Sequence, residues 1–563
     1  MGNIPTWLNG SLLRNGPGSW KVGDDLTFQH LFDCSALLHR FAIKDGRVTY
    51  QNRFVQTETL KKNRAAQRIV VTEFGTASVP DPCHSIFDKV AAIFRPDSAS
   101  DNSMITIYPF GDEFYTFAEA PFIHRINPRT LATEARICVT DYTGVINHTS
   151  HPHIMPDKTV YNLGMSPTRY GPTYNVICFP HGEHMFENAY ILGAIPCRWK
   201  LHPGYMHTFG VTDNYFVIVE QPLSLSVPEF VKAHLYNKNL SACLKWFEGK
   251  STVFHLMDRK TGKVCHTFHS DSFFYLHIIN QYEESNHLVI DICCYKDPKM
   301  INCMFLESII NMQSNPNYSS MFRGRPLRFV LPLGEQSESV QTSSAGEGVE
   351  KRKLLKSVTL GNLSMRLQQP KLKHSESEHE QFTFIAVSGA DDDEVDGSKE
   401  LKHESLEENL VSLENTQAEA FLMEDKSILV RPELLCDLGC ETPRINYDKY
   451  LGKKYRFFYA ISSDVDADNP GTLIKVDVLK KTTKKWCEPN CYPSEPIFVP
   501  KSNSSGEDDG VVLAAMVWGG ISDNHVGLLV LCAKNWTELG RCEFHTNGPV
   551  PKCLHGWFAP NVV

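Results

Sequence analysis

Three histidines lie within six positions of this sequence, His148, His151 and His153, directly before a strand-like run of residues. Histidine is the commonest metal ligand among protein side chains, and it binds through a neutral ring nitrogen. The cluster therefore indicates either a metal site or a solvated loop that carries histidines. This stretch taken alone favours the loop.

Three more histidines stand among large apolar residues at the start of strand-like segments. They are His207 in GYMHTFGVTDNYFVIVEQP, His277 in FFYLHIINQYEESNHLVIDI and His555 in CLHGWFAP. An imidazole in such surroundings needs a partner to offset its loss of water. Four separate core histidines, each with its own hydrogen bond, would meet this need. One shared metal would also meet it, provided that the fold brings distant strand ends together.

Short runs rich in Val, Ile, Phe, Tyr and Thr recur along the chain, whereas helical periodicity is scarce. The clearest runs are 47–56, 159–165, 215–222, 287–295, 455–462 and 526–533. The segments 127–131 and 258–263 predict hairpin turns between such runs. Many short strands at this spacing predict an all-β fold. A β-propeller accommodates 563 residues without splitting into domains, and its strand ends meet at a central axis.

Composition and charge narrow the class of protein. The net charge of −9 argues against a nucleic-acid partner, which requires a basic surface. Seventeen cysteines, an odd number, indicate thiols in a reducing compartment more than a disulfide framework. The first eighteen residues lack the pattern of a secretory signal, and no apolar run reaches the ~18 residues of a membrane span. We expect a cytoplasmic protein.

A polar stretch, 334–425, interrupts the strand pattern with sequences such as GADDDEVDGSKELKHESLEEN. Its composition cannot bury enough apolar surface to offset the entropy of ordering. We expect a disordered insert, with one strand-like exception at 382–387. Because strands resume at 427–434, the insert should lie within a single domain that spans 1–563.

Two segments, 84–94 and 226–247, place apolar residues at helical spacing. As amphipathic helices they would either pack into the core or lie at a membrane surface. The pattern alone favours the core. The residues that would contact a membrane in the second case are Ile86, Phe87, Val90, Phe94, Phe230 and Leu235.

Eight motifs, in this order and spacing, resemble the carotenoid cleavage oxygenases, the family that also contains the retinoid isomerohydrolase of the visual cycle. They are GSLLRNGPG (10–18), FDCSALLHRF (32–41), EFGTASVPDPC (73–83), SHPH (150–153), MHTFG (206–210), ETPRINYDKY (441–450), YPSEPIFVP (492–500) and LHGWF (554–558). The likeness covers the chain outside the polar insert. Within the family the sequence is most similar to the animal branch, and especially to the insect carotenoid isomerooxygenases.

This resemblance implies a seven-bladed β-propeller with a few helices and loops capping its top face over an axial metal. The metal would be one Fe(II) per chain, bound by His151, His207, His277 and His555. His148 and His153 would then not be ligands. The resemblance also implies three carboxylates, Glu119, Glu441 and Glu495, which would orient His207, His277 and His555 in that order.

Such a ligand set has a physical rationale. The commoner mononuclear oxygenase site uses two histidines and one carboxylate. Four neutral imidazoles would leave the ferrous ion its full charge and two octahedral positions open, one of them for O2 as co-substrate. Metal-bound histidines usually donate their second N–H to a carboxylate, which fits the three glutamates.

The implied reaction is oxidative cleavage of a carotenoid, such as β-carotene or zeaxanthin, at its central 15,15′ double bond. Both oxygen atoms of O2 would enter two retinal-type aldehydes, and one half would turn from trans to 11-cis to give visual chromophore. Because the substrate must leave a membrane, we expect peripheral membrane association. Cys83 matches a position proposed for palmitoylation in the vertebrate isomerohydrolase.

Several alternatives stay open from the sequence. The same scaffold supports eccentric cleavage of a carotenoid or retinyl-ester isomerohydrolysis. A carotenoid-binding protein without catalysis is the non-enzyme alternative, although it has no need of an open iron. A structural zinc site could use Cys436, Cys440, Cys487 and Cys491, but zinc pairs are usually spaced more tightly. The oligomeric state is not predicted.

Overall fold

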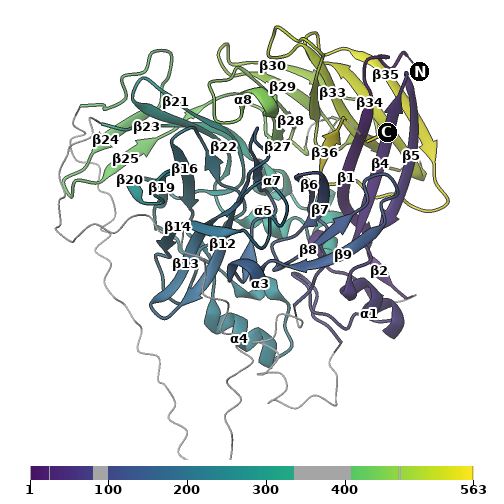
Figure 1. Cartoon of the computed structure of the whole chain (residues 1–563), viewed down its shortest axis with the longest axis horizontal. Coiled ribbons are helices and arrows are strands. Elements are labelled where there is room, and N and C mark those ends of the chain that lie inside the picture. Colours follow the sequence, from purple (N-terminus) through teal and green to yellow (C-terminus); the bar gives the residue numbers. More distant parts are fainter. Residues whose placement is uncertain are drawn as a thin grey trace, which may run out of the picture.

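The computed structural model describes residues 2–23, 26–79, 99–334, 408–466, 468–469, 471–520, 522–560 and 562–563. Within these ranges the strands form seven sheets of four to six strands, arranged as the blades of a β-propeller (Figure 1). The predicted all-β propeller is therefore confirmed. The six strand-like runs that the sequence indicated all coincide with strands.

Most blades are built from strands that follow one another along the chain. The first blade contains β36 (His555–Ala559), β1 (Gly10–Ser19), β4 (Ser35–Lys44) and β5 (Arg47–Phe54). The second contains β6 (Thr106–Phe110), β7 (Glu113–Phe117), β8 (Phe122–Ile126) and β9 (Thr133–Cys138). The third contains β10 (Asn147–His148), β11 (His153–Ile154), β12 (Val160–Thr168), β13 (Gly171–Phe179) and β14 (Tyr190–Pro196).

The remaining blades follow the same plan. The fourth contains β15 (Gly210–Val211), β16 (Tyr215–Glu220), β19 (Thr252–Asp258), β20 (Val264–Ser270), β25 (Ile428–Arg431) and β24 (Glu419–Leu422). The fifth contains β21 (Phe274–Glu284), β22 (His287–Tyr295), β23 (Arg325–Pro332) and β26 (Glu433–Leu434). The sixth contains β27 (Glu441–Arg444), β28 (Phe457–Ile461), β29 (Leu473–Asp477) and β30 (Thr482–Trp486). The seventh contains β31 (Cys491–Pro493), β32 (Ile497–Pro500), β33 (Gly510–Trp518), β34 (Ser522–Cys532) and β35 (Glu538–His545).

The first strands of neighbouring blades lie against one another and line the axis. β21 contacts β15 on one side and β27 on the other, while β36 contacts β32 and β6. The ring is closed by the two ends of the chain, because β36 pairs antiparallel with β1 and places His555 opposite Asn15. Closure of this kind removes free sheet edges around the axis.

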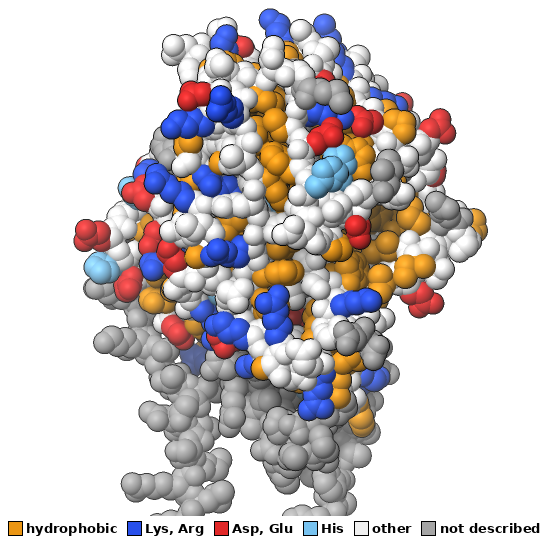
Figure 2. Space-filling view, turned by 90° about the vertical axis from the view of Figure 1, so that its right-hand side faces the viewer, with side chains coloured by type: hydrophobic (Ala, Val, Ile, Leu, Met, Phe, Trp, Pro, Cys, Tyr) orange, Lys and Arg blue, Asp and Glu red, His pale blue; other side chains and the backbone are white. Residues whose placement is uncertain are grey.

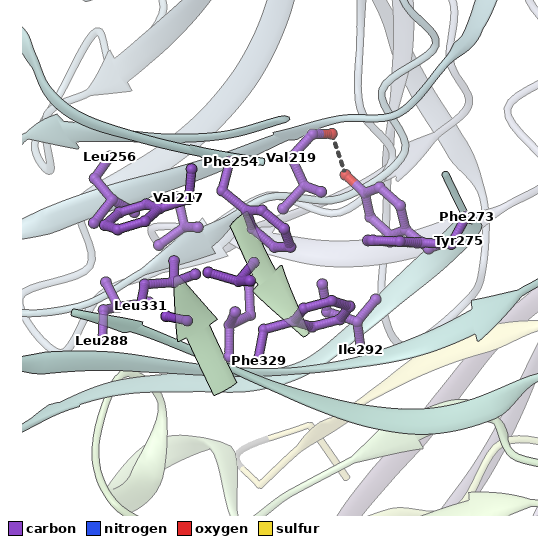
Figure 3. Close-up of a cluster of buried hydrophobic side chains, with 14 of the residues drawn as sticks. Val217, Val219, Phe254, Leu256, Phe273, Tyr275, Leu288, Ile292, Phe329 and Leu331 are labelled. Carbon is purple, nitrogen blue, oxygen red and sulfur yellow. Dashed lines mark hydrogen bonds between the residues drawn. The ribbon is translucent and has the colours of Figure 1, made fainter. Parts of the chain in front are cut away.

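Burial within a blade falls from the axis outward. Every residue of β16 and β22 is buried, whereas the outer strands β5 and β30 are largely exposed. The cause is packing between blades: side chains of β16 and β19 in the fourth blade face those of β22 and β23 in the fifth (Figure 3). Tyr275 adds a hydrogen bond across this interface, from its hydroxyl to the carbonyl of Val219 at 2.9 Å.

Turn chemistry fixes the strand register. In the first blade, β4 and β5 are joined by Asp45 and Gly46, both with positive φ, and Lys44 pairs with Arg47. An Asp-Gly pair is favoured in such a two-residue turn because both positions need positive φ. The predicted hairpin turns at 127–131 and 258–263 join β8 to β9 and β19 to β20.

Short helices and loops cover one end of the axis. The helices of the described ranges are α1 (Glu58–Ala66), α3 (Thr140–Thr143), α4 (Val227–Leu235), α5 (Lys299–Asn302), α6 (Leu306–Ile310), α7 (Tyr318–Phe322) and α8 (Tyr447–Tyr450). Single 3-10 turns are η1 (Leu31–Asp33), η3 (Leu240–Cys243) and η4 (Met312–Ser314), and the minor strands are β2 (Lys21–Val22), β3 (Leu26–Thr27), β17 (Leu223–Leu225) and β18 (Leu244–Trp246). Met300 and Met304, in and just after α5, pack with Tyr205 and Phe274, which lie close to two of the candidate ligands in sequence.

The polar insert ends earlier than the sequence indicated. β24 lies inside the predicted 334–425 insert, pairs with β25 and buries Ala420 completely. The amide of Leu410 donates to the carbonyl of Ala420 at 2.8 Å. Residues 408–425 are therefore part of the fourth blade, because a few apolar residues there complete its core. Residues 335–407, with the strand-like 382–387, lie outside the described residues, as does the segment 84–94.

The face formed by the first and seventh blades carries charges of both signs. In Figure 2, Lys and Arg side chains alternate with Asp and Glu and with strips of apolar side chains. No helix of the described residues is long and apolar enough to cross a membrane. The sixteen cysteines of the described residues are all free thiols.

Candidate metal centre

The four histidines of the predicted ligand set come from four different blades and meet at the axis. His277 lies in β21 and His555 begins β36, whereas His207 precedes β15 and His151 lies between β10 and β11. All four are nearly buried, with 4–9% of each residue exposed. The propeller thus brings together residues as far apart as positions 151 and 555.

Their ring nitrogens converge on one point. Nε2 of His207 lies 3.1 Å from Nε2 of His151 and 3.3 Å from Nε2 of His277. The ligand atoms of His151, His277 and His555 lie within 4.8 Å of one another. In the described part of the chain, this is the one group of three or more His, Cys, Asp or Glu residues with metal-binding spacing. The alternative zinc site on Cys436, Cys440, Cys487 and Cys491 is not formed there.

Three carboxylates hold the outer nitrogens of these rings. His207 donates from Nδ1 to Glu119 at 2.5 Å, and His277 donates from Nδ1 to Glu441 at 2.5 Å. His555 donates from Nδ1 to Glu495 at 2.9 Å. Each glutamate thus meets the histidine that the resemblance assigns to it.

This arrangement fits a cation. With Nδ1–H of His207 and of His277 committed to carboxylates, Nε2 of each ring carries a lone pair, and these two lone pairs, 3.3 Å apart, repel. A metal ion between them would turn the repulsion into coordination. Two imidazole nitrogens bound at right angles, each ~2.1 Å from an ion, would lie ~3.0 Å apart. The observed separations are close to that value.

His151 differs from the other three histidines of the predicted ligand set. No carboxylate of the described residues bonds to its ring; its backbone amide donates to Thr149 Oγ1 at 3.3 Å. Burial lowers the pKa of His151 well below its usual value, and the neighbouring imidazoles act in the same direction. Burial likewise lowers the pKa of His555 to about 4, although Glu495 opposes this shift. Both rings are therefore neutral at physiological pH, as metal binding requires.

The two remaining histidines of the opening cluster are engaged elsewhere. His153 donates from Nε2 to the carbonyl of Phe209 at 2.7 Å and accepts at Nδ1 from the Tyr447 hydroxyl at 3.1 Å. His148 donates from Nδ1 to the carbonyl of Thr149 at 3.0 Å. Both ring nitrogens of His153 are thus used, whereas Nε2 of His148 is buried without a hydrogen-bond partner and His148 is not in the group with metal-binding spacing.

The glutamates differ in their other partners. Glu119 accepts from the Tyr205 hydroxyl at 2.9 Å, and Glu441 accepts from the Tyr295 hydroxyl at 2.9 Å. Burial raises the pKa of Glu441, but its hydrogen-bonded histidine and the other bonds outweigh this, so that the net shift is downward. Glu495 has no tyrosine; it contacts two arginines instead.

Sequence reasoning missed these outer partners, which are Arg14, Arg444, Tyr205 and Tyr295. The two arginines carry a readable signal, because a strand-like segment that is otherwise buried seldom holds a guanidinium without a paired anion. Arg444 also lines a cavity of about 70 Å³ beside His151 and His277, together with Tyr447. The two tyrosines carry no such signal, because buried tyrosines are common.

Comparison with known proteins places the chain in context. The family model described as "Retinal pigment epithelial membrane protein" matches residues 1–560. The carotenoid isomerooxygenase of Drosophila melanogaster is 65% identical over 100% of this chain and 90% of its own length. The carotenoid isomerooxygenase of Galleria mellonella is 48% identical, covering 99% and 92%. The beta,beta-carotene 15,15′-dioxygenase of Gallus gallus is 35% identical, covering 99% and 94%.

Solved structures agree on the fold. A Synechocystis apocarotenoid oxygenase variant matches 99% of this chain and 94% of its own with a TM-score of 0.68 at 18% identity. A cobalt-substituted form of that oxygenase matches with the same TM-score and coverage.

Proposed function

The chain belongs to the retinal pigment epithelial membrane protein family, and from that premise we propose that it is an Fe(II)-dependent dioxygenase that cleaves a carotenoid at its central 15,15′ double bond. The proposal includes conversion of one half of the product to the 11-cis form. The observation that carries it is the convergence of four imidazoles at the propeller axis, three of them held by carboxylates. The names of the insect relatives, carotenoid isomerooxygenase, support the coupled isomerisation.

In this proposal His151, His207, His277 and His555 hold the iron. When bound, the ferrous ion supplies the binding and activation of O2. The protein's own contribution is orientation, because Glu119, Glu441 and Glu495 fix the ring tautomers and leave each Nε2 free for the metal. The group with metal-binding spacing contains histidines and no carboxylate, so a ferrous ion bound there would keep its full charge.

The helix-covered side of the site supplies apolar walls. Its cluster contains Leu276 and Met304, and Phe32, Phe74 and Tyr205 pack against it. A rigid polyene offers few hydrogen bonds, so the shape of such walls must decide which bond lies next to the metal. The same surroundings exclude water from the reacting centre.

Product analysis tests the proposal. All-trans β-carotene and zeaxanthin are incubated with the iron-loaded protein under 18O2, and the aldehydes are separated by length and geometric isomer. We expect two C20 aldehydes per substrate, one of them 11-cis, with one labelled oxygen in each. Aldehydes of unequal length would indicate eccentric cleavage. If neither carotenoid is cleaved and a retinyl ester, incubated in a parallel reaction, gives an unlabelled product, the activity is isomerohydrolysis.

We also propose peripheral association with a membrane through the surface around α4, at the bottom of Figure 1. A groove of about 590 Å³ there is lined by Ile146, Tyr170, Leu201 and Val227, with Arg169 and Lys200 beside them. Tyr170 is 74% exposed and Leu201 is 55% exposed. Apolar residues with adjacent cations suit the headgroup region of an anionic bilayer.

The residues predicted for this contact need correction within the described segment. Phe230 and Leu235 are half-buried in and at the end of α4, whereas Val227, Val231 and Tyr236 are the exposed members. The helix ends at Leu235, so the helical spacing assumed up to 247 does not continue. Ile86, Phe87, Val90 and Phe94, and the candidate acylation site Cys83, lie outside the described residues.

Vesicle sedimentation tests the membrane proposal. The double variant Val227→Asp/Val231→Asp should lose most of its binding to vesicles that contain phosphatidylserine. Leu479→Asp is the matched control, because Leu479 is an exposed leucine in the turn between β29 and β30 of the sixth blade and does not belong to the surface around α4. Equal binding of the double variant and the control would contradict the assignment of this surface.

A further inference from the structure

Glu495 has a fuller set of hydrogen bonds than the other two glutamates. Its Oε1 accepts from His555 Nδ1 at 2.9 Å and from Arg444 Nε at 2.7 Å. Its Oε2 accepts from Arg14 at 3.0 Å and from the amide of Gly556 at 3.0 Å. A carboxylate has about four lone-pair positions, so every one is used. The side chain cannot rotate without breaking several of these bonds.

The two guanidinium groups also bind the backbone on both sides of His555. Arg14 donates to the carbonyl of Leu554 at 2.7 Å, and Arg444 donates to the carbonyl of Gly556 at 3.0 Å. Arg14 makes a further bond, from Nε to Cys553 Sγ at 3.2 Å. His555 is therefore fixed through its ring by Glu495 and through the preceding peptide carbonyl by Arg14, while Arg444 holds the carbonyl of the next residue, Gly556.

The positive charge around Glu495 indicates that Arg14 and Arg444 contribute more to the metal site than to the stability of the fold. Arg14 and Glu495 are almost completely buried, and the side chain of Arg444 is 13% exposed. One carboxylate beside two guanidiniums leaves an excess positive charge next to a site for a cation. Burying such charges is costly, and apolar residues of similar volume often stabilise a fold as well. The presence of both buried arginines is explained if they orient the ring of His555.

We propose that Arg14 and Arg444 are positioning residues for His555 and thereby set the metal affinity of the centre. The inference rests on the proposed function, because it takes His555 as a metal ligand. Arg14 lies in β1 and Arg444 ends β27, so strands of two blades converge on the ligand of β36. The planar fork of arginine donates in two directions at once, which lysine cannot reproduce. The closing strand pair of the propeller and the metal centre are thus held by the same side chains.

The test measures metal binding directly. Wild type, Arg444→Gln, Arg444→Lys and Arg14→Lys are titrated with Fe²⁺ under anaerobic conditions against a chelator, and with Co²⁺ while visible absorption is recorded. The matched control is Arg328→Gln, which removes another buried arginine that binds Asp291 through two bonds of 2.8 Å in the fifth blade. Thermal unfolding of each metal-free protein is recorded in parallel.

We expect Arg444→Gln to lower Fe²⁺ affinity at least tenfold and to shift the Co²⁺ absorption bands, with Arg444→Lys and Arg14→Lys between it and wild type. Arg328→Gln should bind both metals within twofold of wild type despite a lower unfolding temperature. Unchanged affinity and spectrum in Arg444→Gln would overturn the inference. If Arg444→Gln does not fold, the two lysine variants decide by the same criteria.

Failure of the positioning role can be distinguished from failure of the proposed function. If wild type binds no stoichiometric Fe²⁺, or if His555→Ala binds it normally, the proposed function fails. If wild type needs His555 and the arginine variants bind like wild type, only the positioning role fails.

Discussion

Two of the histidine–carboxylate pairs differ in how firmly the glutamate itself is held. Glu119 holds His207 with one further partner, Tyr205, and its side chain is 27% exposed. Glu495 holds His555 with three further donors, and its side chain is 2% exposed. Burial would raise the pKa of Glu495, but Arg444 and His555 outweigh this and lower it well below its usual value. Glu119 and His207 can therefore shift by breaking few hydrogen bonds. Glu495 and His555 are held by many bonds, next to the strand pair that closes the propeller.

The difference follows from where each ligand lies. Glu119 stands in the turn between β7 and β8, and Tyr205 packs beneath the helices that cover the axis. His555 instead begins the strand that closes the ring. Substrate must reach the metal from some side, and the pair with fewer bonds can yield more easily. The pair with saturated bonds keeps the metal in place.

Removal of a metal ligand should have the largest effect. His555→Ala, His151→Ala, His207→Ala or His277→Ala should each abolish stoichiometric iron binding and cleavage. His153→Ala is the control, because the ring of His153 bonds to Phe209 and Tyr447 and points no nitrogen at the metal. Iron content by elemental analysis and product yield are the readouts. Loss of iron from His153→Ala would show that the ligand choice is wrong.

Neutralising the carboxylates should reduce the free energy of unfolding by different amounts in the two pairs. Glu495→Gln leaves two guanidiniums with no charged partner in a buried position and should reduce the free energy of unfolding by ~3–5 kcal/mol. Glu119→Gln should cost about 1 kcal/mol or less, because Glu119 is partly exposed and its ion-pair partner is His207, not a guanidinium. Both should weaken iron binding about 10- to 100-fold. Denaturant unfolding and iron titration are the measurements; equal stability losses would remove the distinction.

Deleting single hydroxyls should sharpen the comparison. Tyr205→Phe leaves Glu119 with only the bond to His207, whereas Tyr295→Phe leaves Glu441 the backbone amide of Thr442 at 2.8 Å. One neutral hydrogen bond contributes about 1 kcal/mol, so Tyr205→Phe should weaken iron binding about fivefold and Tyr295→Phe less. Iron titration of both variants measures the loss of iron affinity in each. A larger loss of affinity for Tyr295→Phe would contradict the expected order.

The smallest effect concerns pH and a histidine outside the centre. Burial lowers the pKa of His30 to about 4. Its Nε2 donates to the carbonyl of Ile301 and its Nδ1 accepts from the amide of Phe32, so the folded ring must be neutral. The unfolded chain binds a proton near pH 6.5, so stability is complete above that pH and falls as pH drops towards 4, by up to ~1.4 kcal/mol per unit. His30→Gln should reduce this slope in denaturant unfolding, whereas replacement of the exposed His184 by Gln should not.

The sequence predicts the propeller because its signals are local. Short runs rich in Val, Ile, Phe, Tyr and Thr, turn segments such as 127–131 and 258–263, and the scarcity of helical periodicity are all features of about ten residues or fewer. The convergence of His151 and His555 is not local, and it became predictable only through the resemblance to a family. Arg14 and Arg444 show the same limit, since nothing in either motif tells which anion pairs with a buried cation.

Two segments show which features of the structure composition and periodicity do not predict. Residues 408–425 read as polar, yet Ala420 packs into the core between the fourth and fifth blades, and Ala418 and Phe421 are buried as well. In α4 the apolar spacing is correct, but tertiary packing half-buries Phe230 and exposes Val227 and Val231. Periodicity identifies an amphipathic helix; which of its apolar residues remain exposed depends on neighbours that are distant in sequence.

Anomalous diffraction from crystals of the iron-loaded protein, recorded on both sides of the iron absorption edge, tests the central claim most directly. A single strong peak should lie within bonding distance of Nε2 of His151, His207, His277 and His555, with every glutamate oxygen outside that distance. A peak bonded to a carboxylate, or one that touches fewer than four of these imidazoles, would contradict the claim.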